Sequence, residues 1–146
     1  MYTHILISTD GSELAQNGVD HGLSLAKALG SKVTIVTVTG PFPIAAVDAG
    51  RSIAAYVNQL EADNEEHAEA ILSAAKAAAE KMALTVETLH IPNALPAAAI
   101  IDAAKTQGCN LIVMASHGYR GIKRVLLGSQ TAEVLATAHI PVLVIR

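Results

Sequence analysis

The sequence has very few aromatic residues and a single cysteine. It contains no Trp, one Phe, three Tyr and one Cys in 146 residues. Cys109 therefore has no partner for an internal disulfide, and its place before an apolar run predicts a small core residue, with a reactive thiol as the alternative. Few aromatic rings leave few surfaces for base stacking, and a formal net charge of −3 provides no basic footprint. Nucleic acid is therefore not an expected partner.

Long apolar runs and metal-binding spacings are also missing. Hydrophobic residues make up 51% of the chain, yet no run approaches the roughly 20 residues that a membrane span requires. The amino terminus has no basic region followed by an apolar core, so we expect a cytoplasmic protein that does not contact membranes. The histidines are too scattered for a zinc site, and no metal ligand is predicted; they are His4, His21, His67, His90, His117 and His139.

The two best-known phosphate-binding sequences are absent as well. No glycine is followed by Lys and then Ser or Thr in the manner of a P-loop, and no G-x-G-x-x-G follows the first apolar run. Any nucleotide site in this chain must therefore be of another kind.

A different glycine pattern lies near the carboxyl end. Ala115-Ser116-His117-Gly118 is followed, after nine residues, by Gly128-Ser129. The preceding apolar run, 110–114, is typical of a buried strand, and 130–138 has helical spacing with Ser129 as its predicted N-cap. Amide groups at the start of a helix attract anions, and glycine permits close approach. These arguments alone favour phosphate binding and a plain connecting loop equally.

Strand-like and helix-like segments alternate along the whole chain. Strands are predicted at 3–9, 33–39, 84–91, 110–115 and 141–145, and helices at 12–29, 51–82, 96–107 and from 128–129 to just before Pro141. Ser12 is a predicted N-cap, and Gly30 and Gly108 are predicted helix ends. Parallel strands need long crossovers, so the alternation predicts a single α/β domain over 1–146, doubly wound, with a five-stranded parallel sheet and about four helices on both faces.

The residues resemble a known family. The segment 114–146 resembles the carboxyl-terminal half of universal stress protein domains, whose nucleotide-binding members carry G-x-x-G, nine residues and G-[ST]. At the amino terminus, 4–12 is similar to the family's first strand and D-x-S turn, and Ala94-Leu95-Pro96 is similar to its G-x-P segment. Ala115 and Ala94 stand where the family has glycine. Because alanine does not adopt positive φ freely, we expect these departures to affect nucleotide affinity more than the fold.

The resemblance implies a strand order of 3-2-1-4-5 and an adenine nucleotide site, with ATP as ligand and Mg²⁺ held mainly by its phosphates. Ligands of such sheets lie where the strand order reverses, here at the carboxyl ends of strands one and four. The implied site has Thr9 and Asp10 near the nucleoside, Val38 at the adenine and Ala115 at the first motif position. The pocket edge would be formed by Tyr119, Arg120 and Gly121. The phosphates would be bound, mainly through main-chain N–H groups, by Ser116, His117, Gly118, Gly128, Ser129, Gln130 and Thr131.

Several of these residues have simpler interpretations. Asp10 could bind ribose or hydrated Mg²⁺, or only cap the helix that follows it. Val38 could be a core residue, and His117 could form a local hydrogen bond. Lys123 and Arg124 are expected to be solvated, because phosphoryl transfer also requires metal ligands and a group that positions the nucleophile. No catalytic residue is assigned, and we expect binding with slow or no hydrolysis.

Three functions follow from this pattern. The first is an ATP-binding regulator or sensor of the stress response. The second is a dimeric interaction module without nucleotide, which Ala115 favours and the retained glycines oppose. The third is an adenylyl-transferring enzyme, ranked last because His21-Gly22 lacks the second histidine of H-x-G-H.

Two surface features are also predicted. The resemblance implies a homodimer through the last strand, Val142 to Ile145, although a loop of the same chain could cover that edge instead. The loop from Gly40 to Gly50 is predicted to be either a flap over the nucleoside or an ordinary packed connection.

Overall fold

The computed structural model describes residues 1–42, 52–118 and 127–146. The elements are β1 (His4–Ser8), α1 (Glu13–Leu29), β2 (Lys32–Val38), α2 (Ile53–Lys81), β3 (Glu87–Ile91), α3 (Pro96–Gln107), β4 (Leu111–Ala115), α4 (Ser129–Thr137) and β5 (Val142–Ile145). All strand pairs are parallel, and the sheet order is β3-β2-β1-β4-β5. The predicted fold class and strand order are confirmed.

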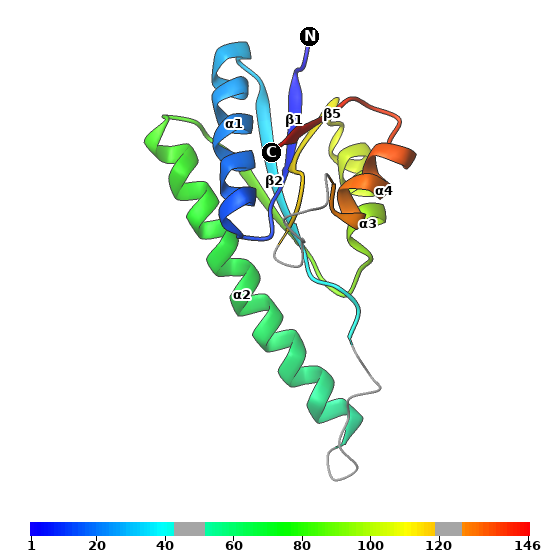
Figure 1. Ribbon diagram of the computed structural model, residues 1–146. Coiled ribbons are helices and arrows are strands. Elements are labelled where there is room, and N and C mark those ends of the chain that lie inside the picture. Colours follow the sequence, from blue (N-terminus) through cyan, green and yellow to red (C-terminus); the bar gives the residue numbers. More distant parts are fainter. Residues whose placement is uncertain (43–51, 119–126) are drawn as a thin grey trace.

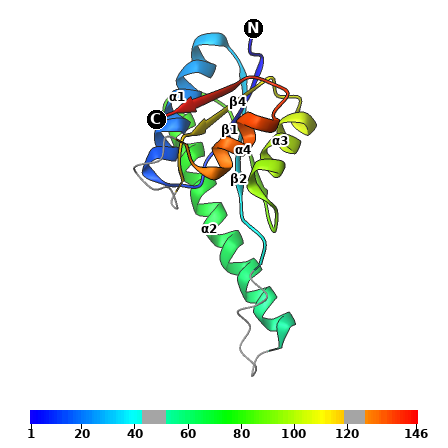
Figure 2. The same ribbon diagram turned by 45° about the vertical axis from the view of Figure 1, so that its right-hand side comes forward.

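Helices cover both faces of the sheet, with α1 and α2 on one face and α3 and α4 on the other (Figures 1 and 2). Side chains of a strand alternate between faces, so neighbouring residues of β1 enter different cores. Ile5 and Ile7 pack with α1 and α2, whereas Leu6 packs with α3 and α4. Because β1 is buried on both faces, its sequence is continuously apolar instead of alternating.

Local signals define the ends of α1 and α3 as predicted. Ser12 is the N-cap of α1, where its side-chain oxygen accepts a hydrogen bond from the Ala15 amide at 3.2 Å. Gly30 and Gly108 end α1 and α3 with φ of 67° and 70°. A side chain is strained in this left-handed conformation, which explains why glycine stands at both positions.

Other boundaries differ from the predictions. Gly128 is the N-cap of α4 and Ser129 is its first helical residue, so the predicted N-cap was wrong by one position. The third strand starts at Glu87, not Leu84, because the Leu84 amide is bound to the Ala79 carbonyl in the turn that ends α2. In α1, Leu29 lies in the last turn and is 46% exposed.

Helix α2 is much longer than the sheet is deep. Its 29 residues span about 43 Å, whereas the seven residues of β2 span about 23 Å. The buried residues Ala68, Leu72, Ala75 and Ala79 all lie in its carboxyl-terminal half, so the Ile53 end projects beyond the sheet (Figure 1). None of the helices in the described segments is long and apolar enough to cross a membrane.

The core position of Leu23 gives a first test of the packing. Leu23 is fully buried between α1 and the sheet. We expect Leu23→Ala to lower the free energy of unfolding by about 2–5 kcal/mol, because the cavity cannot close completely. Leu29→Ala, in the same helix, is the control and should cost about 0.5 kcal/mol or less. Urea denaturation of both variants measures the difference, and equal losses would contradict this placement of α1.

Candidate functional site

The candidate site lies at the carboxyl ends of β1 and β4, which are neighbours in the sheet. From β1 the chain enters α1 on one face, and the chain beyond β4 returns as α4 on the opposite face (Figures 1 and 2). The two connections therefore leave the sheet on opposite faces at this point. This is the position at which open α/β sheets bind their ligands.

The turn after β1 is held by its own side chains. The Thr9 hydroxyl accepts a hydrogen bond from the Gly11 amide at 3.1 Å, and one carboxylate oxygen of Asp10 accepts from the Ser12 amide at 3.0 Å. Gly11 has φ of 80°, which glycine adopts without strain. Asp10 therefore orders the turn that leads into α1, while Ser12 itself is the helix cap.

The segment after β4 is tied to both β5 and α4 through one residue, Ser116, which is 1% exposed. Its amide donates to the Ile145 carbonyl at 2.7 Å, and its carbonyl accepts from the Gly128 amide at 2.6 Å. One position earlier, the Ala115 carbonyl accepts from the buried Thr131 hydroxyl at 2.9 Å. These bonds position the start of α4 against the end of β4.

Space favours glycine at two positions of the motif. A Cβ built on Gly118 would overlap the Asp10 carboxylate, and a Cβ built on Gly128 would lie 3.2 Å from the Ser116 carbonyl oxygen. Neither residue has positive φ. Close approach of the three segments, and not an unusual backbone conformation, is therefore the reason for glycine at these two positions.

The start of α4 carries no side-chain cap. Its N-cap is Gly128, which has no side chain to offer, whereas Ser12 and Ser52 cap α1 and α2 with their hydroxyls. The first amides of a helix have no acceptor within the helix, and the positive end of the helix dipole lies behind them. The first turn of α4, formed by Ser129, Gln130 and Thr131, is thus a favourable place for an anion.

Alanine is compatible with the backbone at both positions where the resembled family has glycine. Ala115 is the last residue of β4, and the Ala94 amide donates to the Thr39 carbonyl at 3.1 Å. Among the described residues, the non-glycine residues with positive φ are Ala83 and Asn93. Neither substitution therefore strains the chain.

The end of β2 forms the other side of the candidate site. Val38 is half-buried and packs against the core of the α3 and α4 face. The next residue, Thr39, donates its amide to the Ile91 carbonyl at 3.0 Å and accepts from Ala94. The ends of β2 and β3 are therefore joined beside the start of α3.

The structure brings most of the predicted site residues together. Thr9 and Asp10, the segment from Ala115 to Gly118, and the start of α4 at 128–131 all meet at one edge of the sheet. Tyr119, Arg120 and Gly121 lie outside the described residues, as do Lys123, Arg124 and most of the predicted flap. Sequence reasoning missed the side-chain role of Gln130, whose Oε1 accepts from the Ala97 amide at 3.0 Å, since no spacing rule links these residues.

His117 takes part in a local interaction, as one of its predicted alternatives states. Its Nδ1 lies 2.9 Å from the Ser116 hydroxyl. In the described part of the chain, no group of three or more His, Cys, Asp or Glu side chains is arranged to hold a metal ion. Among the described residues, the first-turn amides of α4 are therefore the groups of the candidate site that best suit an anion.

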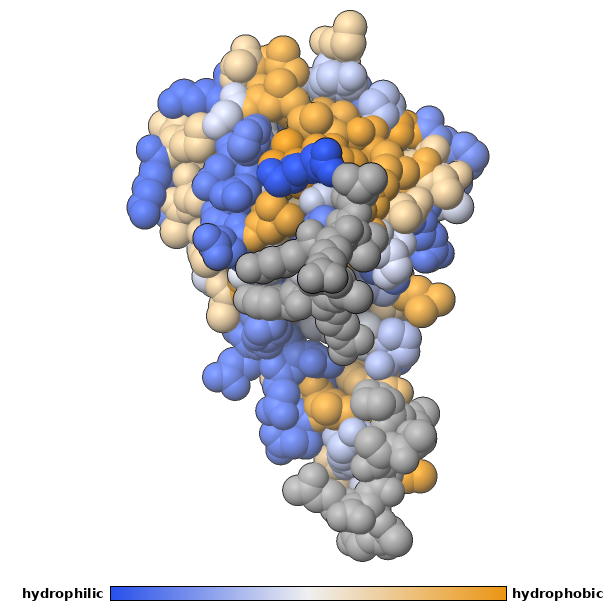
Figure 3. All heavy atoms as spheres, in the orientation of Figure 1, coloured by the Kyte–Doolittle hydropathy of each residue, from blue (hydrophilic) through white to orange (hydrophobic). Residues whose placement is uncertain are grey.

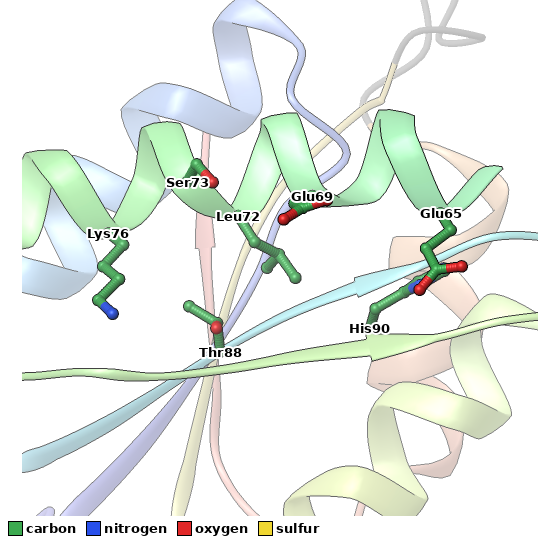
Figure 4. Close-up of a pocket in the computed structure, with 7 residues that line it drawn as sticks. All are labelled: Glu65, Glu69, Leu72, Ser73, Lys76, Thr88 and His90. Atoms are coloured by element: carbon green, nitrogen blue, oxygen red, sulfur yellow. The ribbon is translucent and has the colours of Figure 1, made fainter. Parts of the chain in front are cut away.

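A separate hollow of about 370 Å³ lies between α2 and β3 (Figure 4). Glu65, Glu69, Leu72, Ser73 and Lys76 line it from α2, and Thr88 and His90 line it from β3. None of these residues belongs to the segments that follow β1 and β4. The hollow is therefore distinct from the candidate site at the ends of β1 and β4.

Known proteins resemble this chain over its whole length. A family model described as the universal stress protein family matches residues 1–146. Universal stress protein MJ0531 of Methanocaldococcus jannaschii is 30% identical over 146 residues, which are 100% of this chain and 83% of that protein. The solved structure of protein MJ0577 from the same organism has a TM-score of 0.83 at 29% identity, covering 99% of this chain and 96% of that one. A universal stress protein crystallised in complex with cAMP has a TM-score of 0.72 at 25% identity, covering 99% and 97%.

Cys109 belongs to the core and not to the site. It is 6% exposed, and desolvation, with a smaller contribution from the charge of Glu87, raises the pKa of its thiol to about 11. Because the thiolate is the reactive form, about one thiol in a thousand is ionised at pH 8.

This burial predicts an inert thiol in the folded protein. At pH 8 we expect a chromogenic disulfide reagent to modify Cys109 more than about a hundredfold more slowly in buffer than in urea. Since the folded pKa lies above the unfolded one, the contribution of this group to stability is full below pH 9 and is lost as the pH rises through about 11. Rapid modification of the folded protein at pH 8 would contradict this assignment.

Proposed function

The chain belongs to the universal stress protein family, and from that premise we propose that it binds an adenine nucleotide in the crevice between β1 and β4. The proposed ligand is ATP, with Mg²⁺ held mainly by the phosphates. The protein would act in the cytoplasm as a regulator or sensor of the stress response.

The observation that carries this proposal is the uncapped start of α4. Its first-turn amides, at Ser129, Gln130 and Thr131, follow directly on Gly128, whose lack of a side chain leaves the helix start without a side-chain cap. The helix dipole favours negative charge at this point. Phosphates are the anions that this combination fits, and their contacts would be mainly to the main chain.

The nucleoside would lie toward β1 and β2. The relative crystallised with cAMP supports an adenine ligand for this fold. In this chain Val38 offers an apolar surface at the end of β2. Thr9 and Asp10 follow β1, which lies between β2 and β4 in the sheet. The proposed order of the ligand, from base to ribose to phosphate, therefore follows the order of the strands.

Slow or absent hydrolysis is part of the proposal. One Asp10 carboxylate oxygen accepts from the Ser12 amide and orders the turn before α1. Phosphoryl transfer needs ordered metal ions and a group that orients the attacking nucleophile. In this proposal, occupancy by a nucleotide and not its turnover carries the signal.

Ala115 gives no support to a module without nucleotide. That alternative depended on a loss of function at the first motif position, but Ala115 lies in a regular strand and without positive φ. The backbone that follows it still reaches α4 through Ser116 and Gly128. The nucleotide-binding function is therefore the one that we propose.

We also propose a homodimer through β5. This strand pairs with β4 on one side and forms an edge of the sheet on the other. Leu143 is 37% exposed, and Figure 3 shows apolar side chains gathered on the surface of this region. An apolar edge strand is a template for pairing with another chain, and a second copy would cover it.

Nucleotide binding is tested at Gly128. Gly128→Asp places a carboxylate at the N-cap of α4, where it can cap the helix and repel phosphate. We expect this variant to remain folded and to lose ATP binding, at least about tenfold in Kd, as measured by calorimetry with Mg·ATP. Gly128→Asn is the control, because it has the same shape without the charge and should retain more affinity than the Asp variant. Unchanged affinity in folded Gly128→Asp would contradict the phosphate site.

The dimer is tested on the two edges of the sheet. Leu143→Lys adds a charge to β5, and Thr88→Lys adds the same charge to the opposite edge strand, β3. We expect the β5 variant to shift the mass in solution toward the monomer and the β3 variant to leave it unchanged, because charged side chains oppose edge pairing. Light scattering after gel filtration measures both, and an intact dimer in Leu143→Lys would place the interface elsewhere.

A further inference from the structure

A side chain of α4 caps the neighbouring helix α3. The Gln130 Oε1 accepts a hydrogen bond from the Ala97 amide at 3.0 Å. An amide nitrogen is a donor, so the glutamine must present its oxygen at this contact. The bond joins the first turns of two helices, between residues that are 33 positions apart in sequence.

Helix α3 has no other side-chain cap at this position. Its N-cap is Leu95, whose side chain cannot accept a hydrogen bond, and Pro96 at the first position has no amide hydrogen. Ala97 is therefore the first residue of α3 with an N–H group, and it is 1% exposed. A buried amide without a partner is costly. Gln130 supplies the partner from another element.

The same turn is fastened on its opposite side. The Ala94 amide donates to the Thr39 carbonyl at 3.1 Å, and Thr39 follows Val38, the proposed adenine contact. A short path of hydrogen bonds thus leads from the end of β2, through 94–97, to the first turn of α4. Its two ends are the proposed base side and phosphate side of the crevice.

We propose that Gln130 is a positioning residue that sets the distance between the base side and the phosphate side. This inference rests on the proposed nucleotide function. The side chain of Gln130 acts by holding α3 against α4, whereas its main-chain amide belongs to the phosphate site. ATP occupies both sides at once, so its affinity depends on their separation. A ligand that occupies only one side has no such dependence.

The test compares whole and partial ligands. Gln130→Met preserves the length of the side chain and removes the acceptor. Calorimetry would measure binding of Mg·ATP, adenosine and tripolyphosphate to this variant and to wild type. We expect affinity for ATP to fall about fivefold to tenfold, and affinity for each partial ligand to change by less than about twofold. Gln59→Met is the matched control, because it removes an exposed side-chain hydrogen bond to Asp63 on α2 and should leave all three affinities unchanged.

Two further measurements separate positioning from other roles. Hydrogen exchange of the Ala97 amide in the ligand-free protein should be faster in Gln130→Met than in wild type. Gln130→Glu retains an acceptor, so it should keep the slow exchange at Ala97 while its charge weakens tripolyphosphate binding. Thermal melting of each variant establishes that it is folded at the temperature of the titration.

Each outcome supports or overturns the inference. Equal losses for ATP and tripolyphosphate in Gln130→Met would show direct phosphate contact by the side chain and overturn the positioning role. Unchanged ATP affinity with faster exchange at Ala97 would reduce Gln130 to a purely structural cap and also overturn it. If wild type binds no ATP, the proposed function itself fails, which is a different result from wild-type binding that Gln130→Met leaves intact.

Discussion

The architecture depends on the burial of a parallel sheet on both faces. Strand β1, at its centre, has residues with no exposed surface toward either side, and helices must therefore pack on each face. A chain that supplies helices to both faces has to reverse its direction of winding once, and here it does so between β1 and β4. The candidate site lies at that reversal. Its position in the fold thus follows from the burial of both faces of the sheet and not from the polar residues around it.

Polar residues at this edge serve mainly to hold backbone. Thr9 and Asp10 bind the amides of the turn after β1, and Thr131 binds the carbonyl at the end of β4. With these side chains engaged, the contacts that we propose for the phosphates are to main-chain amides. A site of that kind would recognise the charge and shape of a phosphate group and would make few demands on side-chain identity. Alanine at position 115 keeps the backbone geometry because this residue lies in a regular strand and has no positive φ.

Features encoded by short-range physics could be read from the sequence, and those that depend on distant partners could not. Ser12, Gly30 and Gly108 act within one turn of a helix, and all three were predicted correctly. The assignment of Ser129 as N-cap was wrong because the Gly128 amide is held by Ser116, a contact that no local pattern reports. Likewise the apolar side chain of Leu29 would suggest a core position, but it lies in the last turn of α1 and is 46% exposed. The glycine motif indicated the site, whereas the bond from Gln130 to Ala97 needed the packing of two helices.

Ser116 has no freedom to move on its own. Its amide is committed to the last strand of the sheet and its carbonyl to the residue that starts α4, and the residue is almost fully enclosed. A displacement of β5 relative to β4 must therefore either break one of these bonds or carry the beginning of α4 with it. The two hydrogen bonds of Ser116 therefore couple the outer edge of the sheet to the first turn of α4.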